Sequence, residues 1–221
     1  MDTHQALLTR QSIRKYLKDP VPPESIEKIM TAATWAPSGS NTQPWRFYVA
    51  MGEKRDELLQ ALIEATGPDA PSMEAYEELA GRVEQALSEK LKESNPADPA
   101  GVSLLKLSDE AAQFVRFGSI RFYQAPVAIV VAAPKQMGGS ASQSVGAAVQ
   151  NLLLAAHAKG LATCWLGMPL QYKDQLIDVL GIPEDEVLIT SVCLGYPDNE
   201  SPLNNMGRSR LPYGQTVHVL S

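Results

Sequence analysis

The chain has 221 residues, of which 44% are hydrophobic and 20% charged, and its 19 basic and 25 acidic side chains give a net charge of −6. These are proportions of a globular protein with a substantial core, and they exclude a disordered or fibrous chain. The acidic balance disfavours general nucleic-acid binding, but it is compatible with a local basic pocket for one small anion.

The N-terminal part is predicted to be helical on both sides of a proline-rich break. A first helix over residues 3–10 is followed by a break at 16–23, where prolines prevent the helix from continuing. A second helix over 22–36 has apolar residues at three- and four-residue steps, and the proline that follows residue 36 ends it. An eight-residue polar loop at 37–44 then leads into a strand at 45–51.

The rest of the chain alternates between amphipathic and apolar segments. The expected helices span 53–65, 74–94, 109–117, 144–159 and 170–180. The expected strands span 127–133, 162–166, 188–194 and 216–220. The helix at 144–159 is apolar nearly all round, which indicates burial on more than one face. No repeat or shift in composition divides the chain, so residues 1–221 are predicted to form a single domain.

Neither a membrane segment nor a metal site is expected. No apolar run approaches the roughly 20 residues that a bilayer-spanning helix needs, and polar residues interrupt the first ten positions where a signal peptide would be apolar. Cys164 and Cys193 lie inside apolar runs and lack metal-type spacing. They are predicted to be buried free thiols in a cytoplasmic protein.

Two basic motifs stand at opposite ends of the chain. Arg10, Ser12 and Arg14 alternate in a stretch expected to be extended, so their side chains project to one side and can converge on an anion. Arg208 and Arg210 repeat the pattern near the C-terminus. Either motif alone is as well explained by a solvated basic patch, but together in an acidic chain they predict a phosphate cradle.

The polar loop at 37–44 is the second candidate site. Its small hydroxyls, amides and backbone donors suit a flat heteroaromatic ligand, although a polar connection between prolines explains the same composition. The step from Pro44 to Trp45 into a buried strand fixes this loop in place. The candidate ligand-binding residues are Pro37, Ser38, Gly39, Asn41 and Gln43.

A third candidate is the segment Trp165, Leu166 and Gly167, where a predicted strand ends at a glycine that lets a ligand approach the backbone. A core strand ending in a turn explains it equally well. The chain lacks a phosphate-binding P-loop, a dinucleotide-binding glycine motif and a nucleophile elbow, and its three histidines fit packing or surface roles. Any chemistry is therefore expected to belong to a cofactor.

Taken together, these motifs resemble the FMN-dependent nitroreductase family, in the right order and over almost the whole chain. The matching segments are Leu8–Arg14, Ala36–Trp45, Gly160–Gly167, Gly195–Pro197 and Arg208–Pro212. The resemblance implies an α+β fold with a mostly antiparallel central sheet wrapped by helices. It also implies a homodimer with FMN at the subunit interface and a domain-swapped C-terminal strand, a role that the predicted strand at 216–220 would fill.

The resemblance also assigns roles to the candidate residues. Arg10, Ser12, Arg14, Arg208 and Arg210 would hold the FMN phosphate and polar tail, and Arg14 would also stabilise the reduced ring. The residues of the 37–44 loop would contact the ring from the second subunit. Trp165, Leu166 and Gly167 would line its other side, with a backbone N–H near Gly167 directed at the flavin N5.

The activity implied is transfer of a hydride from NAD(P)H through FMN to nitroaromatics, quinones or similar electron-poor acceptors, by a ping-pong mechanism. Two alternatives remain open. One is specialised chemistry of the same family, such as dehalogenation, enone reduction or flavin fragmentation, with Tyr76, Phe114, Phe117, Phe122 and Tyr123 as candidates to shape a lid. The other is a flavin-binding module without turnover.

Overall fold

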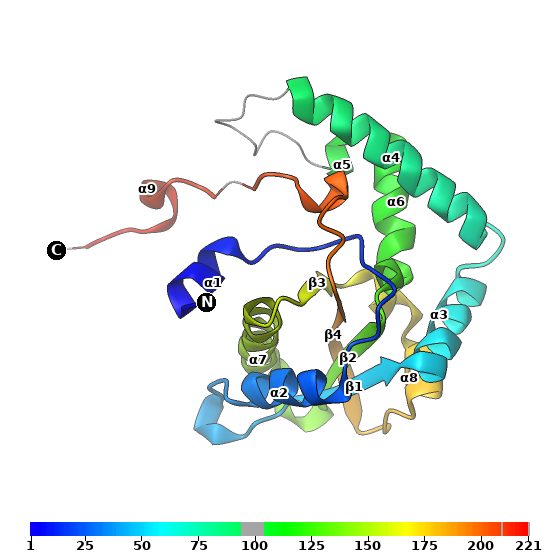
Figure 1. The fold of residues 1–221 in the computed structure, drawn as a ribbon. Helices are drawn as coiled ribbons and strands as arrows, with labels where there is room; N and C mark the ends of the chain where they lie inside the picture. The colour runs from blue at the N-terminus through cyan, green and yellow to red at the C-terminus, as the bar shows by residue number, and fades with distance from the viewer. Residues whose placement is uncertain (94–103, 209, 221) are drawn as a thin grey trace.

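The computed structural model of the chain describes residues 1–93, 104–208 and 210–220 (Figure 1). At its centre is a four-stranded sheet with the order β1-β2-β4-β3. All three neighbouring pairs are antiparallel, which confirms the predicted sheet type. The strands are β1 (Arg46–Met51), β2 (Val127–Pro134), β3 (Ala162–Leu166) and β4 (Glu186–Gly195). The interior strand β2 is apolar along almost its whole length because both of its faces are buried.

Helices cover both faces of this sheet (Figure 1). They are α1 (Thr3–Thr9), α2 (Pro23–Thr34), α3 (Gly52–Thr66), α4 (Met73–Glu93), α5 (Leu104–Leu107), α6 (Asp109–Ile120), α7 (Gly138–Ala158), α8 (Lys173–Leu180) and α9 (Tyr213–Thr216). One apolar core lies between the sheet and the pair α2 and α7. The other lies between the sheet and the group α3, α4, α6 and α8. The result is an α+β protein with helical layers on either side of an antiparallel sheet.

Most helix ends follow local sequence signals. Ser108 caps α6, since its hydroxyl accepts a hydrogen bond from the backbone N–H of Ala111 at 3.1 Å. Gly181 ends α8 in the left-handed conformation, with φ of 63°. Helix α7 begins at Gly138, six residues before the expected start. Its first turns consist of small residues without a clear apolar period, so the sequence pattern does not reveal this start. Helix α8 begins later than expected because a 3₁₀ segment over Met168–Tyr172 precedes it.

The strand predicted at 216–220 does not form within the single chain. Residues 213–216 form the short helix α9, Val217 after it is extended, and residues 217–220 form no strand. This arm projects away from the body of the molecule (Figure 1), with Val219 78% and Leu220 94% exposed. At the outer edge of β3, Ser12 forms a bridge to Thr163. The alternation of apolar residues was real, but no strand of the same chain lies beside it.

No helix in the described ranges combines the length and apolar character required to cross a bilayer. The loop expected at 95–101 lies outside the described residues.

Candidate functional site

The N-terminal basic motif lies along the outer edge of β3. Ser12 forms a parallel bridge with Thr163, and the backbone N–H of Ile13 donates to the Thr163 carbonyl at 3.0 Å. Further along, Tyr16 bridges Pro197 just after β4. The segment is therefore held extended, as its alternating pattern predicted, and its backbone is fixed to the sheet.

The C-terminal basic motif reaches this same segment. The Nη1 of Arg208 donates to Gln11 Oε1 at 3.2 Å, and its Nη2 donates to the Leu8 carbonyl. A cavity of about 230 Å³ opens between the two motifs. Its lining includes Arg10, Ser12, Arg14, Asn204, Arg208 and Arg210. Residues from opposite ends of the chain thus surround one small cavity, which we call the arginine cradle.

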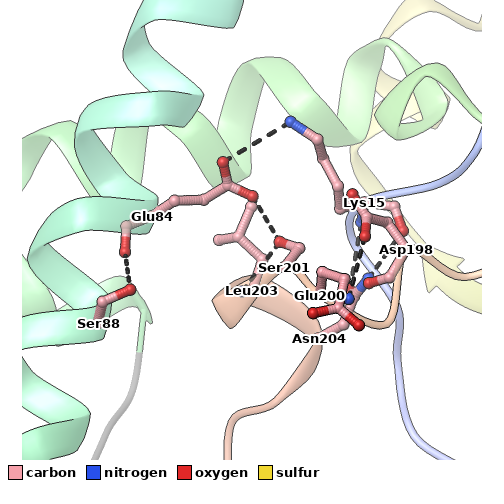
Figure 2. Close-up of polar contacts among 8 residues, drawn as sticks. All are labelled: Lys15, Glu84, Ser88, Asp198, Glu200, Ser201, Leu203 and Asn204. Carbon is pink, nitrogen blue, oxygen red and sulfur yellow. Dashed lines mark hydrogen bonds and ion pairs between the residues drawn. The ribbon is translucent and has the colours of Figure 1, made fainter.

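A buried asparagine that the sequence reasoning missed holds the cradle together (Figure 2). The Oδ1 of Asn204 accepts from the backbone N–H of Arg14 at 2.8 Å and of Lys15 at 3.3 Å. Its Nδ2 donates to the carbonyls of Lys15 and Asp198, both at 2.8 Å. Because Asn204 is only 3% exposed, these bonds are shielded from water and lock the C-terminal turn onto the N-terminal segment. No sequence motif distinguished Asn204 from its neighbour Asn205.

Helix α4 also stabilises the contact between the N-terminal segment and the C-terminal turn. The Ser201 hydroxyl donates to the Glu84 carboxylate, and Lys15 Nζ lies 3.8 Å from the other oxygen of Glu84 (Figure 2). Ser201 also accepts from the backbone N–H of Leu203 at 3.2 Å, which caps the 3₁₀ turn over Pro202–Asn204. Glu84 thereby joins α4 to both ends of the chain.

The electrostatics of the cradle favour an anion. Burial, followed by the positive charges of Arg208 and Arg210, lowers the pKa of Arg10. None of the described residues that line the cavity is acidic. The Nε of Arg14 is buried without a hydrogen-bond partner. Arginines that lie close together, and the buried Nε of Arg14, fit a phosphate group.

Arg14 keeps its charge despite its position. Burial opposes that charge, but the nearby Cys164 and Tyr123 raise the pKa of Arg14 above its ordinary value. Cys164 lies directly opposite Cys193 in the β3–β4 register. Both are buried and free, as predicted. A hydrogen bond from Cys193 and then the charge of Arg14 lower the pKa of Cys164 to about 7, although burial opposes this.

The third candidate segment lies at the end of β3. Trp165 is 44% exposed, and its indole N–H donates to the Thr190 hydroxyl. Leu166 is buried, and its carbonyl accepts from the Ser191 hydroxyl at 3.0 Å. Gly167 has φ of −108°, so its backbone does not require glycine, but a Cβ there would meet no atom within 4 Å. The space in front of this glycine is open to a ligand.

The 37–44 loop contributes nothing to the lining of the arginine cradle of its own chain. It connects α2 to β1 (Figure 1). Ser40, Asn41 and Gln43 all have positive φ, and the Ser38 hydroxyl accepts from the Gln43 N–H at 2.9 Å. Pro37, Gly39, Asn41 and Gln43 are exposed and Ser38 is half-buried, whereas Trp45 is buried and anchors the loop. The loop is a constrained, outward-facing surface.

The histidines take surface and packing roles. His157 Nε2 shares a hydrogen bond of 2.8 Å with the Thr9 hydroxyl, and His4 and His218 are exposed. Burial and the charges of Arg10 and Arg208 lower the pKa of His157. Within the described residues, no group of three or more His, Cys, Asp or Glu side chains is arranged to hold a metal ion.

The antiparallel sheet between helical layers makes this an α+β protein, and the arginine cradle built from both chain ends gives it a cavity suited to an anion. The chain is a member of the nitroreductase family, whose family model matches residues 7–196.

Individual relatives agree with this assignment. The chain is 30% identical over 214 residues to a nitrobenzene nitroreductase of Ectopseudomonas oleovorans, covering 91% of this chain and 89% of that protein. It is 29% identical over 205 residues to a chloronitrobenzene nitroreductase of Comamonas testosteroni, with the same coverage of both chains. The crystal structure of the FMN-dependent nitroreductase NfnB from Mycobacterium smegmatis, in complex with NADPH, superposes with a TM-score of 0.77 at 25% identity, covering 99% of this chain and 97% of that one.

Proposed function

We propose that this protein is an NAD(P)H-dependent FMN oxidoreductase that reduces nitroaromatic and related electron-poor compounds. The observation that carries the proposal is the arginine cradle, which joins both ends of the chain around a cavity that has no acidic residue among its described lining residues. Family membership and the activities named for the relatives support the same function. The FMN and NADPH named for NfnB of M. smegmatis support the choice of cofactor and electron donor.

In this proposal, residues 1–221 form one FMN-binding domain, and each candidate residue has a defined task. Arg10, Ser12, Arg14, Arg208 and Arg210 hold the phosphate and polar tail of FMN. Trp165 and Leu166 would line one side of the ring, and the backbone N–H near Gly167 would be the donor for its N5 position. The outward-facing residues Pro37, Ser38, Gly39, Asn41 and Gln43 contact the ring from a second copy of the chain.

The cofactor supplies the redox chemistry, since bound FMN accepts a hydride from NAD(P)H and passes the electrons to the acceptor. The protein binds and orients the ring, and the positive charge of Arg14 favours its reduction electrostatically. No side chain is assigned as an essential general base. If donor and acceptor occupy one site over the ring in turn, the kinetics would be ping-pong. Quinones would be further electron-poor acceptors.

The homodimer of the proposal is supported by the exposed apolar C-terminal arm. Leu211 is 67% exposed, Tyr213 70% and Leu220 94%. Trp35, beside the 37–44 loop, is 83% exposed. Apolar side chains gathered at exposed positions mark association surfaces. We assign the arm to a swapped strand that pairs with the second copy. We also assign the protein to the cytoplasm.

An anaerobic spectrum tests this function. The purified protein is expected to show the flavin absorbance band, and NADPH or NADH should bleach it. Adding nitrobenzene should restore the band and release a reduced nitrogen product. A protein without flavin, even after incubation with FMN, would contradict the proposal. A flavin that bleaches but is not reoxidised by any nitroaromatic or quinone would support a binding module instead, and product analysis would reveal dehalogenation or enone reduction.

A further inference from the structure

The peptide group between Leu166 and Gly167, at the end of β3, is bonded by two hydroxyl groups of β4. The Leu166 carbonyl accepts from the Ser191 hydroxyl at 3.0 Å and from the Thr190 hydroxyl at 3.2 Å. Thr190 is 6% exposed and Ser191 0%, so both bonds are shielded from water. Because successive side chains of a strand point to opposite faces of the sheet, the two hydroxyls approach this carbonyl from either side. One carbonyl oxygen thus receives two buried side-chain donors, which fix its orientation.

The indole of Trp165 extends this arrangement by one bond. An indole nitrogen can only donate, so the Thr190 oxygen is the acceptor in its bond with Trp165. The single proton of the Thr190 hydroxyl is then available for the Leu166 carbonyl. Trp165, Thr190 and Leu166 therefore form a chain of hydrogen bonds that runs toward the carbonyl. Bonds in such a chain polarise one another and become stronger, by about 10–30% per bond.

The other end of this peptide group is the N–H of Gly167. The carbonyl and the N–H of a trans peptide lie in one plane and point in opposite directions. Since the Leu166 carbonyl points toward β4, the Gly167 N–H points away from β4, toward the outer side of β3. On that side Ser12 of the arginine cradle bridges Thr163. A Cβ at Gly167 would meet no atom within 4 Å, so the residue faces open space.

Hydrogen bonds to the carbonyl make the N–H of the same peptide a stronger donor. A peptide group is a resonance system, so electron density drawn toward the bonded oxygen leaves the nitrogen and makes its proton more acidic. The two hydroxyls also hold the plane of the peptide, and with it the direction of the Gly167 N–H. Thr190 and Ser191 can therefore act through the peptide on any group that accepts this hydrogen bond.

We propose that Thr190 and Ser191 are positioning residues for the flavin N5, which orient and polarise the Gly167 N–H through the Leu166 carbonyl. The inference rests on the proposed function, in which this N–H is the donor to N5. Oxidised N5 has a lone pair that accepts a hydrogen bond, whereas reduced N5 carries a proton. The two hydroxyls therefore favour the oxidised ring over the reduced one, which makes the reduced ring a stronger electron donor to the acceptor.

The flavin midpoint potential tests this role. Thr190→Val and Ser191→Ala each remove one hydroxyl and should weaken the binding of oxidised FMN relative to reduced FMN about three- to tenfold. For a two-electron couple this raises the midpoint potential by about 15–30 mV. A merely structural loss would weaken both redox forms equally and leave the potential unchanged. Thr66→Val in α3 and Ser88→Ala in α4 are the matched controls, since each hydroxyl donates to a carbonyl of its own helix at 2.8 Å, and neither should move the potential.

A measurement on the FMN-free protein tests the contact itself. The chain has three Leu–Gly peptides, at 166–167, 180–181 and 194–195. Protein labelled with carbonyl-¹³C leucine and ¹⁵N glycine therefore gives three signals in an NMR spectrum that correlates the two nuclei across the peptide bond. Loss of a hydrogen bond moves a carbonyl carbon upfield, so Thr190→Val and Ser191→Ala should each shift the Leu166 signal. The Leu180 signal, from the end of α8, should stay in place.

A Leu166 signal that neither substitution moves would overturn the inference, because the hydroxyls would then not bond this carbonyl. So would a midpoint potential that keeps its wild-type value in both variants. A wild-type protein that takes up no FMN would contradict the proposed function and with it the role at N5. The labelled spectrum would still decide whether Thr190 and Ser191 hold the peptide.

Discussion

The side chain of Asn204 accepts a hydrogen bond from the backbone N–H of Arg14 at 2.8 Å, across 190 positions of sequence. The same side chain bonds Lys15 through both its oxygen and its nitrogen. Asn204 therefore bonds the N-terminal segment as a neighbouring strand would, and it fixes that segment to the C-terminal turn beside the arginine cradle. Because amide and carbonyl partners are both used, neither Asp nor Leu can replace it without leaving buried polar groups unpaired.

Asn204→Ala is expected to reduce both stability and FMN affinity. The change leaves the backbone N–H groups of Arg14 and Lys15 without their acceptor, whereas the carbonyls of Lys15 and Asp198 keep the backbone N–H donors of Asp198 and Ser201. The free energy of unfolding should fall by about 1–3 kcal/mol. FMN should bind more weakly because Arg14 and Arg208 lose their fixed separation. Urea unfolding and fluorescence titration with FMN measure the two effects. Asn199→Ala, at an exposed position of the same loop, serves as the control and should change neither.

Gly118 of α6 is packed too closely for any side chain. A Cβ at this position would lie 2.5 Å from Tyr123 Cε1 and 2.7 Å from the Tyr76 hydroxyl oxygen. Gly118→Ala should therefore destabilise the protein by about 1–3 kcal/mol, because the added Cβ overpacks the side chains of Tyr76 and Tyr123. The midpoint of urea unfolding gives the loss directly.

Gly81→Ala provides the matched control for this prediction. Gly81 is also helical, in α4, but it is exposed and a Cβ there meets no atom within 4 Å. Alanine should stabilise the helix by roughly 0.5–1 kcal/mol. Equal effects at the two positions would show that the close packing of Tyr76 and Tyr123 around Gly118 is absent.

His157 should make the stability of the FMN-free protein depend on pH. Burial and then the charges of Arg10 and Arg208 lower the pKa of His157 below its ordinary value of 6.5. The unfolded chain therefore takes up the proton first as the pH falls, so the histidine's contribution is complete above pH 6.5 and is lost below it. Urea unfolding of wild type and His157→Gln between pH 8 and 5 should show a shallower fall for the variant. Parallel curves would contradict the predicted shift.

Periodicity and proline positions were enough to predict the sheet strands and most helices of this fold. The apolar runs at β2, β3 and β4 match buried strands, because burial on both faces leaves little freedom in composition. The start of α7 escaped prediction because its small residues lack a period. The strand expected at 216–220 does not form within the single chain, because pairing depends on a neighbour, which the alternation of side chains does not reveal.

The candidate site was predictable to a similar extent. The arginine motifs were found because two like motifs in an acidic chain are unusual, and the structure brings Arg10 and Arg208 to one cavity. Asn204 was missed because its role comes from where the turn falls in space rather than from a pattern. The 37–44 loop was recognised by composition, but its distance from the cradle within one chain is a property of the tertiary structure.

The central claim is that the arginine cradle binds the phosphate of FMN, and the affinity ratio between FMN and riboflavin tests it most directly. Charged hydrogen bonds contribute about 1.5–3 kcal/mol each, so two or more to the phosphate should favour FMN by at least about 100-fold in the wild-type apoprotein. In the double variant Arg208→Ala and Arg210→Ala, the ratio should fall at least about tenfold below the wild-type value while the fold is retained, because Arg10 and Arg14 remain. Arg82→Ala, which removes an exposed ion pair with Glu110, is the control and should preserve the ratio. A wild-type protein that binds FMN and riboflavin equally, or a double variant with an undiminished ratio, would contradict the assignment.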